Sequence, residues 1–255
     1  MRLFVILVLL CLPQISIAQN AQFSDDANFF LVGDSFTNGS TEWAARIRAS
    51  STPFELNFFS AGGRSLSQIS EAFMDNYRSD TYDAVVIAGG VNDVAGVSSS
   101  LMVSENAELR DDIVNGFSAT VKGIIERTNG EHFILTTIPP FRGGSFWTLE
   151  RQQIADQYDT WVRGFVADQP NVSLFDIGTV LDSDGDQIID PQHASSDNFH
   201  PQACGFGEEC GASFIADSFI TQFQVTSVPE PSTIVFLSAI FVAALGKRRR
   251  RVGPR

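Results

Sequence analysis

Three polar side chains in this sequence could together hydrolyse an ester. Ser35 directly follows the apolar run 29–32 and the pair Gly33-Asp34, and its hydroxyl could act as a nucleophile. Asp197 and His200 are three residues apart, so on one turn the carboxylate could accept a hydrogen bond from one ring nitrogen and leave the other as a base. Either motif alone is also typical of an ordinary turn. Together they predict a catalytic triad of Ser35, His200 and Asp197.

An ester hydrolase also needs hydrogen-bond donors for the negative oxygen of the tetrahedral intermediate. The sequence offers the backbone N–H of Ser35, the backbone N–H of Gly63 and the side-chain amide of Asn92. Gly62 precedes Gly63, and we assign the donor to Gly63. The alternative is that Gly63 only makes a turn and Asn92 only caps a loop.

The surrounding elements alternate between short apolar runs and longer helical stretches. The expected strands are 29–32, 56–59, 84–88, 133–138 and 172–175. The expected helices are 42–49, 66–77, 105–127, 149–166 and about 211–223. Nearly continuous apolar strands indicate a sheet that is covered on both faces. The pattern predicts a three-layer α/β/α doubly wound, flavodoxin-like domain with a central, mainly parallel five-stranded sheet.

Parallel strands place their carboxyl ends at one edge of the sheet, and ligands bind there in such folds. The segments 33–39, 60–65 and 89–93 follow the first three expected strands. We therefore expect Ser35, Gly63 and Asn92 to meet at this edge.

The four segments resemble the sequence blocks of the SGNH (GDSL-type) hydrolases. The resemblance rests on Gly33-Asp34-Ser35, the glycine within 62–65, the segment 90–93 and the segment 197–201, and it extends over nearly all of 28–223. It implies that Ser35 is the nucleophile, that Gly63 and Asn92 are oxyanion donors, that His200 is the base and that Asp197 orients His200. One difference is Phe36, which stands where the family often has leucine.

An acidic run just before the Asp197 motif could bind calcium. Asp182, Asp184, Asp186 and Asp190 surround a glycine and supply the carboxylate oxygens that calcium prefers. The run resembles the DxDGDxxxD loops of exported calcium-binding proteins, but it lacks the spacing of an EF-hand. The alternative is a solvated acidic turn. We expect no cofactor for catalysis and a calcium ion, if bound, to be structural.

The first 18 residues predict a secretory signal peptide. Arg2 precedes the apolar run 3–12, and Ser16-Ile17-Ala18 supplies small residues for signal peptidase. We expect cleavage after Ala18, which leaves 19–227 as one hydrolase domain.

The last 28 residues form a tail with three parts, which are 228–232 with two prolines, the apolar run 234–245 and the basic run 247–251. The tail, 228–255, resembles the PEP-CTERM sorting segment of Gram-negative envelope proteins. This resemblance implies a short transmembrane helix, transient anchoring and cleavage near Pro-Glu-Pro by an exosortase-like enzyme. A permanent C-terminal anchor is the alternative. The expected destination is the cell surface or extracellular matrix.

Charge and cysteine content limit the function classes further. The formal net charge is −13, and 29 of the 30 acidic residues lie between the two ends. A domain this acidic argues against nucleic-acid binding, which needs cations. Cys204 and Cys210 remain in the mature chain, and an oxidising compartment favours a disulfide between them.

The sequence thus predicts an exported serine ester hydrolase that acts through an acyl-enzyme. O-acetyl groups on carbohydrate of an envelope or biofilm are the first expectation for the substrate, and lipid or short-chain acyl esters are the second. A non-catalytic glycan- or calcium-binding matrix protein on the same fold is the alternative. A metal-dependent phosphodiesterase finds no support, because no His/Asp metal cluster is evident.

Overall fold

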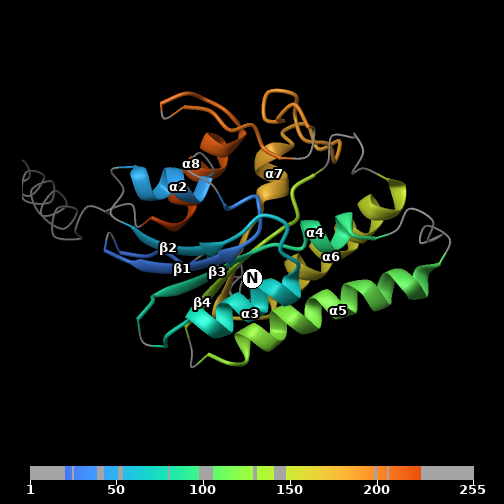
Figure 1. Cartoon of the computed structure of the whole chain (residues 1–255), viewed down its shortest axis with the longest axis horizontal. Helices are drawn as coiled ribbons and strands as arrows, with labels where there is room; N and C mark the ends of the chain where they lie inside the picture. Colours follow the sequence, from blue (N-terminus) through green and yellow to red (C-terminus); the bar gives the residue numbers. More distant parts are fainter. Residues whose placement is uncertain are drawn as a thin grey trace, which may run out of the picture.

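The structure is a computed structural model, and its central feature is a single parallel sheet (Figure 1). It describes residues 21–24, 26–38, 43–50, 54–79, 81–97, 106–128, 131–140, 148–197, 200–205 and 207–224. The predicted signal peptide and the predicted sorting tail lie outside these residues. Among the described residues, no helix has the length and apolar character needed to cross a membrane.

The sheet has five strands in the order β2-β1-β3-β4-β5, and every neighbouring pair is parallel. The strands are β1 (Asn28–Gly33), β2 (Glu55–Ser60), β3 (Ala84–Ala88), β4 (His132–Thr136) and β5 (Val172–Phe175). The predicted doubly wound, five-stranded parallel fold is confirmed. Because all strands run the same way, the segments that follow them lie at one edge of the sheet.

Helices cover both faces of the sheet (Figure 1). One face carries α3 (Leu66–Asn76), α4 (Val91–Ala95), α5 (Ala107–Ile125) and α6 (Leu149–Ala167). The other face carries α2 (Trp43–Ala49), α7 (Ile177–Leu181) and α8 (Gly211–Phe223). The sequence did not predict α4 and α7, because five residues are too few to show a helical period.

The side chains of β1 explain why its sequence is apolar throughout. Phe30 and Val32 pack into the core beneath α3, α5 and α6, whereas Phe29 and Leu31 pack against α2 and α8. All four side chains are fully buried. Burying each stabilises the fold by roughly 1.5–3 kcal/mol, so the strand that leads to Ser35 is firmly fixed.

The two ends of the domain meet at the opposite edge of the sheet. The N–H of Phe23 donates to the carbonyl of Phe223 at 2.9 Å, and Phe23 forms an isolated parallel bridge with Gln224. The Phe23 ring also packs on Phe29 and His132, at the amino ends of β1 and β4. The chain therefore enters and leaves the described fold on the side away from the carboxyl ends of the strands.

Candidate active site

The turn after β1 holds Ser35 in a fixed position. The N–H of Thr37 donates to the Asp34 carbonyl at 3.2 Å, and the N–H of Phe36 donates to the Asp34 carboxylate at 3.0 Å. Gly33 allows this tight geometry, because a Cβ there would lie 2.4 Å from the Thr37 Oγ1 and 2.7 Å from the Ala88 carbonyl oxygen. Ser35 therefore stands at the carboxyl end of β1 on a turn that only glycine at 33 permits.

A second turn holds Asp197 and His200. An isolated antiparallel bridge joins Ala194 to Pro201, and the N–H of Ser195 donates to the His200 carbonyl at 2.9 Å. The Asp197 carboxylate accepts from the His200 N–H at 2.9 Å and from the Ser195 hydroxyl. These bonds fix both ends of the segment that carries the histidine.

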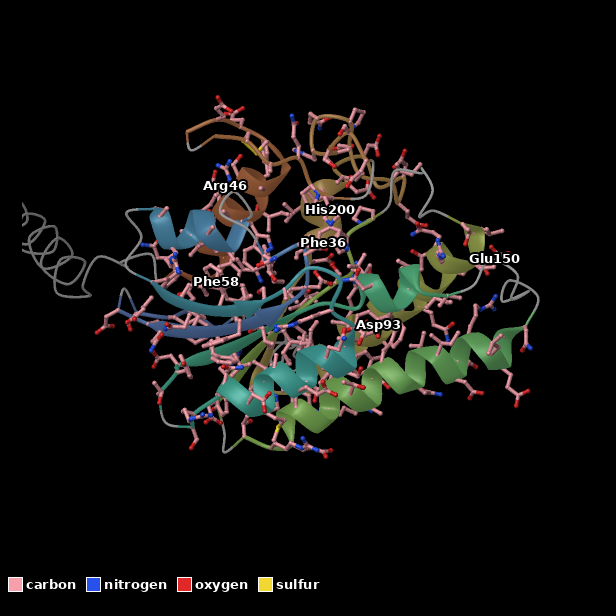
Figure 2. All side chains as sticks on the ribbon, in the orientation of Figure 1. Phe36, Arg46, Phe58, Asp93, Glu150 and His200 are labelled. Atoms are coloured by element: carbon pink, nitrogen blue, oxygen red, sulfur yellow. A yellow bond between two sulfur atoms is a disulfide. The ribbon has the colours of Figure 1, made fainter. Side chains whose placement is uncertain are left out.

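The two turns bring the three residues together. The His200 Nε2 lies 3.0 Å from the Ser35 Oγ, and the His200 Nδ1 lies 2.7 Å from the Asp197 Oδ2. The His200 ring packs 5.0 Å from the ring of Phe36 (Figure 2). With Nδ1 protonated, Nε2 can accept the serine proton, and the carboxylate can stabilise the imidazolium that forms. The arrangement is thus chemically able to activate a serine nucleophile.

The candidate oxyanion donors lie in segments that are tied to each other. The Asn92 Nδ2 donates to the Arg64 carbonyl at 3.1 Å, and the Asp93 Oδ2 accepts from the Leu66 N–H at 2.8 Å. A primary amide has two N–H donors, so Asn92 keeps one for a ligand. Gly63 has a φ of 76°, which favours glycine.

The backbone N–H groups of Ser35 and Gly63 are also available. In the described part of the chain, neither donates a hydrogen bond to protein. A Cβ on Gly62 would lie 4.0 Å from the Ser35 Cβ, which places this loop beside Ser35.

These features agree with a comparison to protein-family models. The model of the GDSL-like lipase/acylhydrolase family matches residues 31–206. The chain belongs to this family. It is therefore an enzyme that hydrolyses ester bonds. The match spans the Ser35 turn, the Gly63 and Asn92 segments and the Asp197–His200 turn.

Solved structures share the family's fold. A member of the lipolytic protein G-D-S-L family from Veillonella parvula is 15% identical, with a TM-score of 0.56, and the match covers 76% of this chain and 96% of that one. An acetylxylan esterase from Geobacillus stearothermophilus is 17% identical, with a TM-score of 0.55, and the match covers 80% of this chain and 95% of that one. A comparison with curated protein sequences gave no match.

A disulfide loop follows the histidine turn. Cys204 and Cys210 are bonded, and their Cα atoms are 6.2 Å apart. The buried guanidinium of Arg46, on α2, donates to the carbonyls of Cys204 and Gly205 (Figure 2). The segment that follows His200 is thus fixed covalently and also held to a neighbouring helix.

The acidic loop differs in part from the calcium site that the sequence predicts. Carboxylate oxygens of Asp182, Asp184 and Asp190 lie within 4.8 Å of one another, but Asp186 does not join them. Instead, the Asp186 Oδ1 accepts from the Ile188 N–H at 2.9 Å. Gly185, within this loop, has a φ of 77°. Three carboxylates fit a cation that would complete its six to eight oxygen ligands with carbonyls or water.

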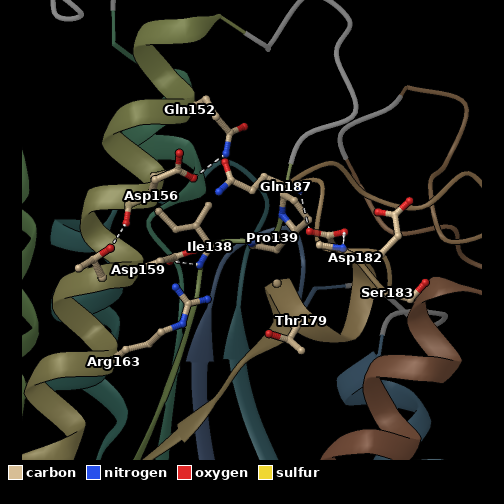
Figure 3. A pocket seen from close by; sticks show the side chains of 16 residues that line it. Ile138, Pro139, Gln152, Asp156, Asp159, Arg163, Thr179, Asp182, Ser183 and Gln187 are labelled. Carbon is tan, nitrogen blue, oxygen red and sulfur yellow. Dashed lines mark hydrogen bonds between the residues drawn. The ribbon is translucent and has the colours of Figure 1, made fainter.

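A cavity of about 440 Å³ with a mixed polar and apolar lining lies on the same edge of the sheet, beyond the end of β4 (Figure 3). Its walls are α6, α7 and the 182–187 loop. The Asp159 carboxylate accepts from the Ile138 N–H at 2.8 Å, and burial raises the pKa of Asp159 well above its usual value. Pro139 lines this cavity and also a small one beneath the Ser35 turn. Pro139 is thus common to the two cavities, whereas Ser35, Asn92 and His200 do not line the larger one.

Arg163 is held in the wall of this cavity by an ion pair. Its Nε and one terminal nitrogen donate to the Asp176 carboxylate at 2.9 and 3.1 Å. Gln152 donates to Asp156 at 2.8 Å, and burial raises the pKa of Asp156. Carboxylates, amides and hydroxyls predominate in the lining, which suits a ligand with many hydroxyl groups.

Sequence reasoning missed two acidic residues of the site. The motifs assign Asp34 and Asp93 no role of their own, although both carboxyls form hydrogen bonds that shape the site. Burial raises the pKa of both, and the charge of Asp93 adds to the effect on Asp34. The sequence does place an aspartate in each motif, close to the end of an apolar strand. It does not show that either side chain is buried.

Proposed function

We propose that this chain is an exported serine esterase that removes O-acetyl or other short acyl groups from carbohydrate. Ser35 is the nucleophile, His200 the general base and acid, and Asp197 the residue that orients His200. The single observation that carries these roles is the continuous pair of contacts from Ser35 Oγ to His200 Nε2 at 3.0 Å and from His200 Nδ1 to Asp197 Oδ2 at 2.7 Å.

The reaction proceeds in two halves. The Ser35 Oγ attacks the ester carbonyl carbon while its proton passes to the His200 Nε2, which gives a tetrahedral oxyanion. The oxyanion accepts hydrogen bonds from the N–H groups of Ser35 and Gly63 and from Asn92. The C–O bond to the alcohol then breaks, and His200 donates the proton to the leaving oxygen. Water, activated by His200, attacks the acyl-enzyme and releases the carboxylic acid.

Carbohydrate is the favoured alcohol because many polar side chains line the cavity that shares Pro139 with the small cavity beneath the Ser35 turn. Its lining offers carboxylates, amides and hydroxyls that can bind sugar hydroxyls. A protein of the same fold from Geobacillus stearothermophilus is an acetylxylan esterase. A lipid ester would need an apolar channel, and the lining that the structure describes is mixed rather than apolar.

Filling this cavity is expected to weaken carbohydrate turnover selectively. Thr160, an exposed residue of α6, lines the cavity. In Thr160→Phe, KM for an acetylated oligosaccharide should rise about tenfold, which corresponds to about 1.4 kcal/mol. Hydrolysis of p-nitrophenyl acetate, which is too small to fill the cavity, should not change.

The matched control is Thr160→Val, which removes the hydroxyl but keeps the space and should behave as the wild type. Steady-state kinetics on the oligosaccharide, p-nitrophenyl acetate and p-nitrophenyl palmitate compare the substrate classes. Preference for the palmitate ester, or an unchanged oligosaccharide KM in Thr160→Phe, would contradict a carbohydrate substrate bound in this cavity.

Export is the second part of the proposal and rests on the predicted signal peptide and sorting tail. Both predicted segments would join the fold near residues 21 and 224, on the edge opposite the Ser35 site. A chain anchored at this edge would present its active site away from the membrane. Signal peptidase and an exosortase-like enzyme are the processing partners that this proposal implies.

A structural calcium ion in the 182–190 loop is the third part of the proposal. If calcium binds, saturation at about 100 times Kd should stabilise the fold by about 2.7 kcal/mol. Asp184→Asn should remove this gain, whereas Asp186→Asn, outside the carboxylate group, should keep it. Calorimetry measures calcium binding, and thermal unfolding measures the stabilisation of the wild type and of the two variants. If calorimetry detects no heat of binding and millimolar calcium does not stabilise the fold, the loop holds no structural calcium ion.

A further inference from the structure

Asp34 is a buried carboxyl group directly beside the nucleophile, and only one of its two oxygens has a hydrogen-bond partner. The side chain is 1% exposed. Its Oδ1 accepts from the Phe36 N–H at 3.0 Å. Its Oδ2 is fully buried and makes no hydrogen bond with any described part of the chain. An ionised carboxylate with a bare buried oxygen is costly, so this group calls for a physical explanation.

Asp34 lines a small cavity beneath the Ser35 turn. A Cβ on Gly89 would lie 3.8 Å from the Asp34 Oδ2. The cavity has a volume of about 10 Å³, which is close to the space that a single water molecule needs. Its other walls come from β3, β4 and α7, and none of the other residues that line it carries a titratable side chain.

The charged group that acts on Asp34 is Asp93, at the start of α4. Burial raises the pKa of Asp34 to about 7, and the negative charge of Asp93 contributes in the same direction. The Asp93 carboxylate is itself engaged with the Leu66 N–H at 2.8 Å. Among the described residues, no basic side chain acts on the Asp34 carboxyl, and only backbone N–H groups, chiefly that of Phe36, favour its charged form.

A negative charge at this place would oppose catalysis. Asp34 precedes Ser35, whose N–H is a proposed oxyanion donor, so an ionised carboxylate would lie near the developing oxyanion and raise its energy. A neutral carboxylic acid avoids this repulsion. It still accepts from the Phe36 N–H through one oxygen, and its O–H can donate to a water molecule in the cavity.

We propose that Asp34 is a positioning residue that works as a neutral carboxylic acid. Its Oδ1 holds the turn that presents Ser35, and its protonated Oδ2 donates to one water molecule enclosed between β1, β3 and β4. The same proton keeps negative charge away from the oxyanion donors. This role rests on the proposed function, in which Ser35 is the nucleophile.

The test compares Asp34→Asn with Asp34→Ala. Asparagine is neutral at every pH, keeps an oxygen for the Phe36 N–H and offers N–H donors to the cavity. Asp34→Asn should retain kcat for p-nitrophenyl acetate close to the wild-type maximum. Asp34→Ala loses the bond to Phe36 and should be about tenfold or more slower at all pH values. Asp75→Asn, an exposed change on α3, is the control.

The pH profile is the readout that a purely structural role would not move. Wild-type kcat should decline as pH rises above about 7, where Asp34 ionises. This decline should be absent in Asp34→Asn. An unchanged decline in Asp34→Asn, or activity as low as that of Asp34→Ala, would overturn the proposal.

Thermal unfolding gives a readout that does not depend on activity. Because the pKa of Asp34 is higher in the folded than in the unfolded protein, the folded state keeps a proton that the unfolded chain has lost. The wild type should therefore lose stability relative to Asp34→Asn as pH rises from about 4 to 7. A stability difference that does not vary with pH would also overturn the proposal. If the wild type is inactive but its stability relative to Asp34→Asn still varies with pH in this way, the proposed esterase function is wrong and Asp34 is still a neutral acid in the folded protein.

Discussion

The Ser35→Ala variant is expected to lose ester hydrolysis, with kcat for p-nitrophenyl acetate falling on the order of 10⁶-fold. Alanine cannot form the acyl-enzyme, so only weak catalysis by the oxyanion donors and by substrate binding would remain. The Ser35 side chain contributes one contact, to His200 at 3.0 Å, and no buried core surface. The fold should therefore be retained, with a thermal unfolding temperature near that of the wild type.

The matched control for this variant is Ser79→Ala. Ser79 is exposed in the connection between α3 and β3, at the edge of the sheet away from Ser35. The Ser79→Ala variant should hydrolyse p-nitrophenyl acetate at the wild-type rate. Turnover by folded Ser35→Ala at a level near that of Ser79→Ala would exclude Ser35 as the nucleophile and, with it, the proposed mechanism.

The His200→Ala variant should lose activity to a similar extent, on the order of 10⁶-fold in kcat, because nothing else would accept the Ser35 proton. The more informative measurement is the double variant Ser35→Ala/His200→Ala. Residues that act as one unit are strongly non-additive, so the double variant should be no slower than either single variant. Mass spectrometry of the wild type with a slow ester should show an acylated Ser35 that His200→Ala does not accumulate.

His132→Gln is the control for the histidine. The His132 Nε2 lies 2.8 Å from the Ser173 Oγ at the amino end of β4, and glutamine can retain that hydrogen bond. The variant should be fully active. If the double variant were far slower than both single variants, Ser35 and His200 would act independently, and the triad would be the wrong description of the site.

Orientation of the site relative to the chain ends has a consequence for the substrate. The domain ends meet through Phe23 and Phe223 at the amino end of the sheet, and Ser35 lies at the carboxyl end. If the predicted tail anchors the chain, the site faces away from the anchor. This arrangement favours a polymer outside the membrane over a lipid within it, in agreement with the proposed carbohydrate substrate.

The strands and the main helices could be predicted from the sequence because each is long enough to show its own pattern. Four or five consecutive apolar residues, as in β1 and β3, indicate a strand that is buried on both faces. Alternation of such runs with helices requires crossover connections and hence a parallel sheet. The carboxyl-end rule then places the segments after β1, β2 and β3 at one edge. Local sequence thus determined the fold class and the general location of the site.

Tertiary structure alone decided how the distant parts meet. Ser35 and His200 are 165 positions apart, and their 3.0 Å contact depends on how the fold brings the turn closed by the Ala194–Pro201 bridge to the Ser35 turn. No local pattern encodes this distance. The short helices α4 and α7 likewise form through packing, and in α7 also through the Asp176 cap, rather than through periodicity.

The acidic residues show most clearly which properties follow from the sequence and which depend on the tertiary structure. Asp34, Asp159 and Asp186 are the same residue type, and the sequence gives no reason to treat their side chains differently. Packing buries Asp34 beside the nucleophile and Asp159 beneath a cavity, whereas Asp186 stays exposed on its loop. The pKa of a carboxyl depends on the water that the fold removes and on the charges that it brings near. Sequence therefore predicted the candidate reacting groups, and the tertiary structure determined the electrostatic environment in which they lie.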